Sequence, residues 1–348
     1  MIRIPVKTEK PYEVLVAEGL LQEAPARIAS LSSQPGKLFF VSDQTVYSLY
    51  GGRLEEALKA GGFAPSGFFA FPSGEASKSL VVYQQLLEAM VRAQLSRKDL
   101  VIALGGGVTG DLTGFAAATY LRGLPWVQIP TTLLAMVDSS VGGKTGLNLP
   151  EGKNLLGAFH QPSLVLCDPA LLASLPPEEL KNGMGELIKT AFLHEPLWEL
   201  LEAWEGALPS GELIARAIEV KAALVAADEA DFGTRRLLNL GHSIGHAIEG
   251  VSSYQIPHGQ AVAMGMRSIT RAAVRQGLCE SSALTRLEAL LTRHHLNSEN
   301  PFGAEELLPF MKHDKKAGGS WLTLVIPRRI GQCELRKLSW EELPDWIG

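Results

Sequence analysis

The stretch LVIALGGGVTGD, residues 100–111, decides the fold. Its apolar, β-branched beginning predicts a buried strand, and the glycines follow where a strand passes into a helix. Counted from Gly105, the loop satisfies G-x-G-x-x-G, a spacing that lets backbone N–H groups approach a pyrophosphate at the start of the next helix. The acidic residue expected about 20 positions later is missing at that spacing. A dinucleotide site and a plain strand–helix turn are therefore both open.

The same strand-then-helix order recurs on both sides of this loop. Strands are expected at 37–42, 67–71 and 126–129, and helices at 54–60 and 80–95. This alternation predicts a parallel-type sheet with helices on both faces.

Beyond the Pro176-Pro177 pair the periodicity becomes helical. A late apolar run at 321–326 is expected to form a small hairpin or to return to a sheet edge. We therefore predict an α/β dinucleotide-binding domain over residues 1–176 and an all-α domain for metal and substrate over 177–348. The expected helices of the second domain are 178–194, 196–206, 211–229, 235–250, 259–276, 281–295 and 304–312.

Composition excludes several classes of function. With 348 residues the chain is longer than one core usually supports, which favours two domains. The net charge of −5 and the lack of a basic run argue against nucleic acid or an anionic membrane as a partner. Three widely separated cysteines indicate free thiols in a reducing compartment. The N-terminus is interrupted by charges, and no apolar run approaches the ~18 residues of a membrane span. We expect a cytoplasmic protein.

Two further loops are candidates for anion binding. SGEASK (73–78) follows an expected strand and is either an anion site or a helix cap. DSSVGGKT (138–145) is similar to G-x-x-x-x-G-K-T, but Asp138 stands where the first glycine would approach phosphate, so ATP binding is disfavoured. A loop with one acid and one lysine, followed by Lys153, suits phosphate or a dinucleotide; a solvated turn is the alternative.

The segment RRLLNLGHSIGHAIEG (235–250) carries a polar stripe. Arg235, Asn239, His242 and His246 are spaced by 4, 3 and 4, and on one helix they would lie within about 60° of one another. A cation, an amide and two imidazoles are not the lysines and glutamates of a solvated face. The pattern favours an internal, functional face over ordinary surface or core histidines.

The two histidines of the stripe suggest a metal. They resemble the zinc-protease motif H-E-x-x-H, but Ser243 replaces the glutamate that acts as base there, so a protease is disfavoured. His258, at the expected start of the next helix, and Glu186 are candidates for further ligands. Histidine, histidine and glutamate make an open site for Zn²⁺ or a similar cation. Spacing alone leaves the choice among His242, His246, His258 and Glu186 open.

Taken together, five segments resemble the 3-dehydroquinate synthase family of sugar-phosphate cyclases. They are GGGVTGDLTGFAAATYLRG (105–123), IPTTLLAMVDSSVGGKTGLNLPEGKNLLGAFHQP (129–162), GELIKTAF (185–192), LLNLGHSIGHAIE (237–249) and PHG (257–259). The resemblance implies an NAD-binding α/β domain joined to a metal-bearing helical domain, usually a homodimer with the site in the cleft. It implies conversion of 3-deoxy-D-arabino-heptulosonate 7-phosphate to 3-dehydroquinate and phosphate in the shikimate pathway of aromatic amino acid biosynthesis.

The resemblance also implies roles for individual residues. Glu186, His242 and His258 match ligands of Zn²⁺ or Co²⁺, and His246 matches a substrate-facing histidine. The NAD positions are Asp43, Ser73, Gly74, Glu75, Ala76, Ser77, Lys78, Gly106, Gly107, Val108, Thr109, Gly110, Asp111, Thr131, Thr132, Lys144 and Lys153. Substrate positions are Asp138, Lys144, Asn154, Lys189, Lys221, Arg235 and Asn239, with Arg122 reaching the neighbouring subunit's site and Lys315, or else Lys312 or Lys316, on the phosphate side.

The implied reaction recycles NAD through oxidation, phosphate elimination, reduction, ring opening and an intramolecular aldol closure. In it, Lys144, Asn154, Arg122 and Lys315 would hold phosphate, Arg235 and Lys221 the carboxylate, and His246 and Lys189 would handle protons. Leu240 and Ser174 depart from the family pattern at positions without chemistry.

Three other functions compete with this one. A cyclase for a sugar without a carboxylate would have no anion for Arg235 and Asn239 to hold. A polyol dehydrogenase of the iron-dependent alcohol dehydrogenase type would accumulate NADH. A non-catalytic metal and nucleotide sensor would bind NAD without turnover.

Overall fold

The computed structural model describes residues 1–31, 36–313 and 320–347. The chain forms two compact units: unit 1 comprises Met1–Leu175 and Leu208–Ala230, and unit 2 comprises Pro176–Ala207 and Asp231–Gly348. The expected second domain contained residues 208–230, whereas in the structure these residues belong to unit 1. Helix α8 (Gly211–Ala227) packs against strands β1 and β2 of unit 1, because its buried apolar side chains cover that end of the sheet.

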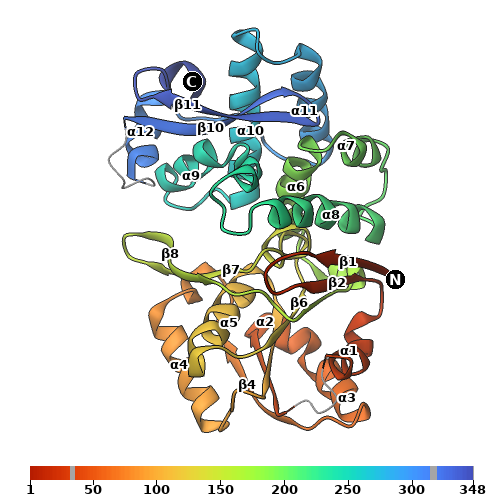
Figure 1. Cartoon of the computed structure of the whole chain (residues 1–348). Coiled ribbons are helices and arrows are strands. Elements are labelled where there is room, and N and C mark those ends of the chain that lie inside the picture. The colour runs from red at the N-terminus through yellow and green to blue at the C-terminus, as the bar shows by residue number, and fades with distance from the viewer. Residues whose placement is uncertain (32–35, 314–319, 348) are drawn as a thin grey trace. The chain divides into compact units, whose positions relative to one another are not determined.

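Unit 1 is built on a seven-stranded sheet in the order β1-β2-β9-β6-β5-β3-β4 (Figure 1). All neighbouring pairs are parallel except β1 with β2. The predicted strands at 37–42, 67–71, 100–104 and 126–129 are confirmed as β3 to β6; β1, β2 and β9 were not predicted. The bounds are β1 Ile2–Val6, β2 Tyr12–Val16, β3 Leu38–Asp43, β4 Pro65–Phe71, β5 Leu100–Gly105, β6 Trp126–Pro130 and β9 Leu164–Cys167.

Helices cover both faces of this sheet, as predicted. On one face, α4 and α5 pack their apolar side chains, such as Leu86 and Phe115, onto β3 and β5. Helices α1 and α3 pack together on the other side in Figure 1. The helices are α1 Leu20–Ala29, α2 Gln44–Val46, α3 Gly52–Ala60, α4 Leu80–Arg92 and α5 Gly107–Thr119, with short helical turns η1 Tyr47–Gly51, η2 Glu75–Ser77, η3 Tyr120–Arg122, η4 Ala135–Ser139 and η5 Pro169–Ser174.

The string DSSVGGKT does not form the loop of a P-loop protein. Asp138 lies in η4, and Lys144 begins strand β7 (Lys144–Leu149), which pairs with β8 (Gly152–Phe159) in an antiparallel hairpin. Between η4 and β7 the chain turns at Gly142 and Gly143, whose φ angles are 99° and 66°. A helix followed by a strand reverses the strand–loop–helix order that a phosphate loop requires.

Unit 2 is mainly helical, as expected, and it also contains a two-stranded hairpin. The late apolar run forms a hairpin of β10 (Trp321–Arg329) and β11 (Gln332–Ser339), the first of the two alternatives expected for it. The helices are α6 Pro177–Phe192, α7 Glu195–Glu202, α9 His242–Val251, α10 His258–Arg275, α11 Ser281–Arg293, α12 Ala304–His313 and α13 Pro344–Ile347, with a 3-10 helix η6 at Thr234–Asn239.

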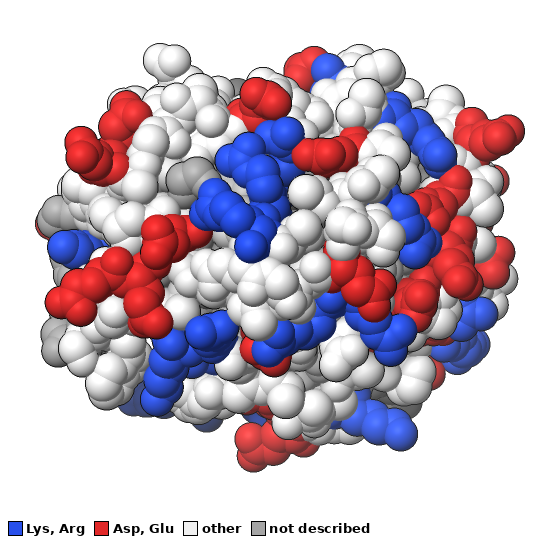
Figure 2. Space-filling view, turned by 90° about the horizontal axis from the view of Figure 1, so that it is seen from above, with Lys and Arg blue, Asp and Glu red and all other residues white. Residues whose placement is uncertain are grey.

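Figure 2 shows acidic and basic side chains interspersed on one face, and neither sign covers it alone. Among the described residues, no helix combines the length and the apolar character that a membrane crossing requires.

Candidate functional site

The polar stripe is not one helix, as predicted, but two short elements. Arg235 and Asn239 belong to η6, and His242 and His246 belong to α9. The break falls at Gly241, whose φ of 76° is unfavourable for other residues. A side chain there would also meet α10, because its Cβ would lie 2.7 Å from the carbonyl oxygen of Val262. Glycine thus starts α9 and lets its first turn approach α10.

A second close approach joins α6 to α10. A Cβ on Gly185 would collide with the carbonyl oxygen of Gly259, so the two backbones can meet only because both residues are glycine. The amide of Gly259 also donates a hydrogen bond of 2.5 Å to the side chain of Asn182 on α6. Glu186 directly follows Gly185, and His258 directly precedes Gly259. The close approach of the two glycines therefore brings Glu186 and His258 together.

Three side chains, one from each of these helices, converge on one point. The Nε2 atoms of His242 and His258 lie 3.5 and 3.3 Å from Oε1 of Glu186. The ligand atoms of all three lie within 4.8 Å of one another, close enough to hold one metal ion. We call Glu186, His242 and His258 the metal cluster. Sequence analysis proposed these three, and the structure brings them together within unit 2.

The electrostatics of the metal cluster follow from its burial. Burial lowers the pKa of His242 to about 3, with help from the Lys189 ammonium. Burial alone would also lower the pKa of His258, but the carboxylates of Glu186 and Glu249 outweigh it and raise the value to about 10. Burial would raise the pKa of Glu186, but nearby groups hold that pKa well below its usual range. These groups are the Lys189 ammonium, 2.6 Å from Oε2 of Glu186, and both imidazoles.

The donor set fits a divalent cation. Oε1 of Glu186 is fully buried and has no hydrogen-bond partner among the described residues. The Nδ1 atom of His242 lies 3.3 Å from the carbonyl oxygen of Leu240, which leaves Nε2 directed toward Glu186. Two imidazoles and one carboxylate are a ligand set of catalytic zinc sites that keep a position open.

One member of this region was missed by sequence analysis. Oε2 of Glu249 lies 3.0 Å from Nδ1 of His258, and the carboxyl group is buried. His246, one turn after His242, is exposed, and its ring centroid lies 5.4 Å from that of His242. Glu249 stands seven residues after His242, so extending the stripe by one more turn would have found it.

The remaining candidates of unit 2 differ in burial. Lys189 and Arg235 are buried, whereas Asn239 is exposed. Lys312 lies with its Nζ 5.5 Å from the ring centre of Trp340. Lys315 and Lys316 lie outside the residues that the structure describes.

In unit 1, the glycine loop (Gly105–Gly110) passes from β5 into α5 as predicted. Gly106 is the cap residue of α5, and Gly107 is its first residue. A Cβ on Gly106 would lie 3.0 Å from the methyl group of Thr132, so the loop and the 131–132 segment are in close contact. The amide of Thr131 donates to the carbonyl of Gly105 at 3.0 Å.

Charged side chains beside this loop pair with one another. The buried Lys78 ammonium forms an ion pair with Asp111 on α5 and donates to Oδ1 of Asn154 at 2.5 Å. Burial raises the pKa of Asp111, while Lys78 opposes that shift. Glu75 accepts a 2.6 Å hydrogen bond from Asn148. Residues of SGEASK, α5, β7 and β8 therefore meet in one network.

The segment 73–78 is not the cap of the next helix. Ser79 caps α4, with its Oγ 3.4 Å from the amide of Val82. Ser73 instead donates to Oδ1 of Asp43 at 2.7 Å, and Asp43 caps α2. The alternative of a helix cap for SGEASK is thus wrong.

Lys221 was expected in the second domain, but it belongs to unit 1. It is buried on α8 in unit 1, donates to the carbonyl of Asp138 at 2.5 Å and forms an ion pair with that residue's carboxylate. Arg235 belongs to unit 2. Arg122 and Lys144 are exposed, and Lys153 is partly exposed.

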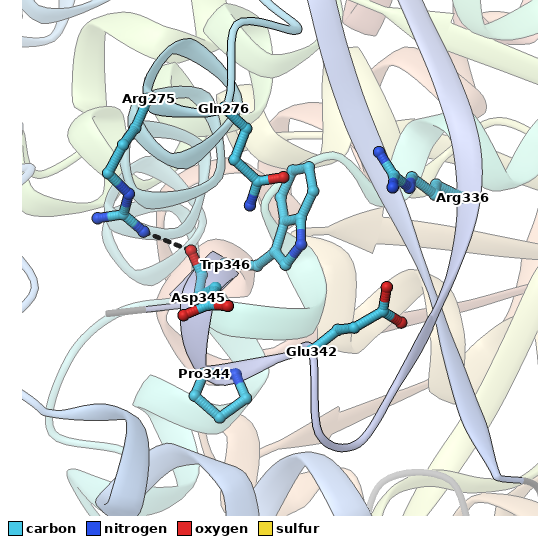
Figure 3. A pocket seen from close by; sticks show the side chains of 7 residues that line it. All are labelled: Arg275, Gln276, Arg336, Glu342, Pro344, Asp345 and Trp346. Carbon is cyan, nitrogen blue, oxygen red and sulfur yellow. Dashed lines mark hydrogen bonds between the residues drawn. The ribbon is translucent and has the colours of Figure 1, made fainter.

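A cavity of about 480 Å³ opens elsewhere in unit 2, between α10, β11 and the C-terminal helix α13 (Figure 3). The residues that line it contact one another. Arg275 donates to the carbonyl of Asp345, and Cζ of Arg336 lies 5.4 Å from the ring centre of Trp346. None of the predicted site residues lines it. Its lining is Arg275, Gln276, Arg336, Glu342, Pro344, Asp345 and Trp346.

The chain has the architecture of the dehydroquinate synthase-like proteins. It combines a parallel sheet and its glycine turn with a helical unit that holds two histidines and a glutamate. Solved structures show the same fold. A 2-epi-5-epi-valiolone synthase from Streptomyces hygroscopicus subsp. jinggangensis 5008 with NAD⁺ and Zn²⁺ bound has a TM-score of 0.86 and 30% identity, covering 98% of this chain and 97% of that one. A 2-deoxy-scyllo-inosose synthase complexed with carbaglucose-6-phosphate, NAD⁺ and Co²⁺ has a TM-score of 0.86 at 24% identity, with 99% of both chains covered.

Within that class, the chain belongs to the 3-dehydroquinate synthase family. The family model described as 3-dehydroquinate synthase N-terminal matches residues 68–182, and the C-terminal one matches 183–317. The chain is 41% identical over 345 residues to the 3-dehydroquinate synthase of Streptococcus suis (strain 05ZYH33), with 97% of both proteins covered. It is 40% identical over 346 residues to that of Streptococcus mutans serotype c, with the same coverage.

Proposed function

We propose that the chain is an NAD- and metal-dependent carbon–oxygen lyase that converts 3-deoxy-D-arabino-heptulosonate 7-phosphate to 3-dehydroquinate and phosphate. Family membership and the relatives named 3-dehydroquinate synthase support the reaction. The observation that carries the proposal is the metal cluster, in which three helices direct one carboxylate and two imidazoles to one point.

The proposal assigns Glu186, His242 and His258 to a divalent cation, Zn²⁺ or Co²⁺. When bound, the cation supplies Lewis-acid polarisation of a substrate hydroxyl and NAD supplies a reversible hydride acceptor. Lys189 places a buried positive charge 2.6 Å from Glu186, which keeps that carboxylate ionised at neutral pH. The exposed His246 is accessible on the same face of α9 to exchange a proton with substrate.

The proposal places NAD along the glycine loop and the segments that contact it. The start of α5 offers backbone N–H groups and the positive end of a helix dipole to a pyrophosphate. Thr131 and Thr132 adjoin this loop, and the Lys78–Asp111 pair fixes SGEASK beside it. Asp43, Lys144 and Lys153 complete the set by resemblance to the family.

The substrate's two anionic groups need separate cations. Arg235 can grip a carboxylate bidentately, and Asn239 lies four residues later on η6. Lys144, Asn154, Arg122 and Lys315 are assigned to the phosphate by resemblance. Lys221 is assigned to the carboxylate in the same way, and in this role it shares its charge between Asp138 and the substrate.

The proposal includes a cytoplasmic homodimer. Exposed Arg122 lies in η3 at a surface position, as a residue reaching a neighbouring subunit must. Light scattering on the purified chain tests the assembly: a mass twice 37.5 kDa is expected, and a monomer that retains full activity contradicts the role of Arg122.

The deciding experiment measures phosphate release from 3-deoxy-D-arabino-heptulosonate 7-phosphate by the purified full chain, with NAD and Zn²⁺ each added or removed. We expect release that requires both and no net accumulation of NADH, because the hydride returns to the product. A protein that binds NAD and Zn²⁺ but releases no phosphate would refute the proposal. NADH accumulating with a simple polyol would assign the chain to a dehydrogenase instead.

A further inference from the structure

We propose that Glu249 is a positioning residue of the metal site: it holds His258 in the orientation that presents Nε2 to the cation, without binding the cation itself. The inference rests on the proposed function in one respect, since it takes Glu186, His242 and His258 as the ligands. It goes beyond that function by assigning a role to a buried acid, Glu249, to which neither the stripe nor the resemblance gave one.

The position of Glu249 on α9 is specific. It follows His242 by seven residues and His246 by three, so the three side chains lie within about 60° around the helix. Only 3% of Glu249 is exposed. A carboxylate is expensive to bury unless a partner compensates it. The helix therefore directs an acid toward the histidines, on the face that also carries a metal ligand.

The contact with His258 fixes the chemistry of the imidazole. Oε2 of Glu249 lies 3.0 Å from Nδ1 of His258. An ionised carboxylate can only accept, so Nδ1 must donate. On the opposite side of the ring, Nε2 lies 3.3 Å from Oε1 of Glu186. Once a cation takes the place of the proton on Nε2, the lone pair of Nε2 would point to the centre of the metal cluster. Carboxylate–histidine–metal arrangements use this geometry to orient the ligand and increase its basicity.

A second possibility is that Glu249 itself binds a cation. Ligand atoms of His246, Glu249 and His258 also lie within 4.8 Å of one another. Nδ1 of His258 lies at hydrogen-bond distance from Glu249, and while it donates to that carboxylate it cannot also coordinate a cation. Backbone contacts also hold His258 toward α6, where Gly259 bonds Asn182. The geometry therefore favours one cation per chain, with Glu249 behind its ligand.

The test compares Glu249→Gln and Glu249→Ala with wild type in the full chain. Glu178→Gln is the matched control, because it removes one acidic charge from α6, where its side chain is 71% exposed. Zn²⁺ affinity is measured by competition with a chromophoric chelator, metal stoichiometry by titration, and site geometry by the visible spectrum of the Co²⁺-loaded protein. Thermal unfolding of the metal-free proteins is measured in parallel.

We expect Glu249→Ala to weaken Zn²⁺ binding by roughly 10–100-fold, the usual effect of removing such a partner. Glu249→Gln should lose less, since its amide oxygen still accepts from Nδ1 without the charge. Both should alter the Co²⁺ spectrum, and Glu178→Gln should leave affinity and spectrum unchanged. A purely structural role would lower the unfolding temperature while leaving affinity and spectrum at their wild-type values, and that result overturns the proposal. Two ions per chain would also overturn it.

His242→Ala separates the failure of this inference from that of the metal site. If His242→Ala abolishes Zn²⁺ binding while both Glu249 variants bind normally, the role of Glu249 is wrong and the metal cluster stands. If His242→Ala binds Zn²⁺ like wild type, the ligand set itself is wrong, and this inference falls with it. If wild type binds Zn²⁺ but releases no phosphate, the function fails while the Glu249 result still decides the inference.

Discussion

The metal cluster of unit 2 and the glycine-loop region of unit 1 differ in what their charged side chains face. In the metal cluster, Glu186, His242 and His258 converge on one point, which one cation would satisfy. In unit 1, charged groups neutralise each other directly, as Lys78 does with Asp111 and Lys221 with Asp138. Convergence of this kind supports the proposed metal site on geometric grounds. Mutual pairing gives no such support, so the assignments in unit 1 depend much more on the family.

The strongest test of this comparison removes the acid of the metal cluster. Glu186→Gln replaces the buried carboxylate with a neutral group of nearly the same shape. We expect loss of bound Zn²⁺ and a decrease in phosphate release of at least ~1000-fold, because a Lewis acid contributes several kcal/mol and 1.4 kcal/mol corresponds to tenfold. Metal analysis and the phosphate assay check this. Retention of stoichiometric Zn²⁺ by a folded variant would show that the three side chains do not form the site.

The next test asks whether Lys189 compensates Glu186 when no metal is bound. Both are buried, with 1% and 0% of their side chains exposed. Lys189→Met should destabilise the metal-free protein by about 3 kcal/mol, since it breaks a buried pair. Added Zn²⁺ should recover part of that loss. Denaturant unfolding with and without Zn²⁺ measures both effects, with Lys181→Met, a half-buried lysine on the same helix, as the control. Equal destabilisation with and without metal would argue against compensation.

A smaller effect is expected from the packing of the glycine loop. In Gly110→Ala, the new methyl group would collide with the side chain of Gln128 on β6. We expect a loss of about 2 kcal/mol from overpacking, without a change in Zn²⁺ affinity. Gly52→Ala is the matched control, since a Cβ there meets nothing within 4 Å. Thermal unfolding measures the loss of stability, and competition with a chelator measures Zn²⁺ affinity. A weaker Zn²⁺ affinity would contradict the independence of the two regions.

The smallest expected effect concerns Lys78. Lys78→Met leaves the Asp111 carboxylate without its ion pair beside the glycine loop. NAD affinity should decrease about tenfold, because the loss of one charge-assisted contact amounts to roughly 1.5 kcal/mol. Lys59→Met is the control, because it removes the surface ion pair of Lys59 with Glu55 in unit 1. It should change NAD affinity less than twofold. Fluorescence titration with NAD measures the affinity of both variants and of the wild type. Unchanged affinity in Lys78→Met would make the pair structural and remove it from the proposed NAD site.

Sequence patterns predicted the central sheet well and the elements around it less well. Strands β3 to β6 were found because they are continuous apolar runs beside recognisable turns. Strands β7 and β8 were missed because glycines and polar residues interrupt them, as in GKNLLGAF. The break between η6 and α9 was also missed, since periodicity cannot register a single residue such as Gly241 that turns the chain.

The candidate site shows the same limits. His242 and Glu186 were identified as candidates because imidazoles and a carboxylate stand out on apolar helices. Their meeting depends on the glycine contact between α6 and α10, which no spacing rule reveals. Lys221 was placed with the helical unit because α8 looks like its neighbours in sequence, whereas its packing partners are strands from the first few residues of the chain.

That placement of α8 has a consequence for the order in which the protein can be completed during synthesis. Unit 1 requires residues 208–230, which leave the ribosome only after residues 176–207 of unit 2 have been made. The sheet can therefore begin to assemble early, but the end formed by β1 and β2 lacks its covering helix until about two thirds of the chain has emerged. A chain that stops at residue 176 contains every strand of the sheet and still lacks part of the unit.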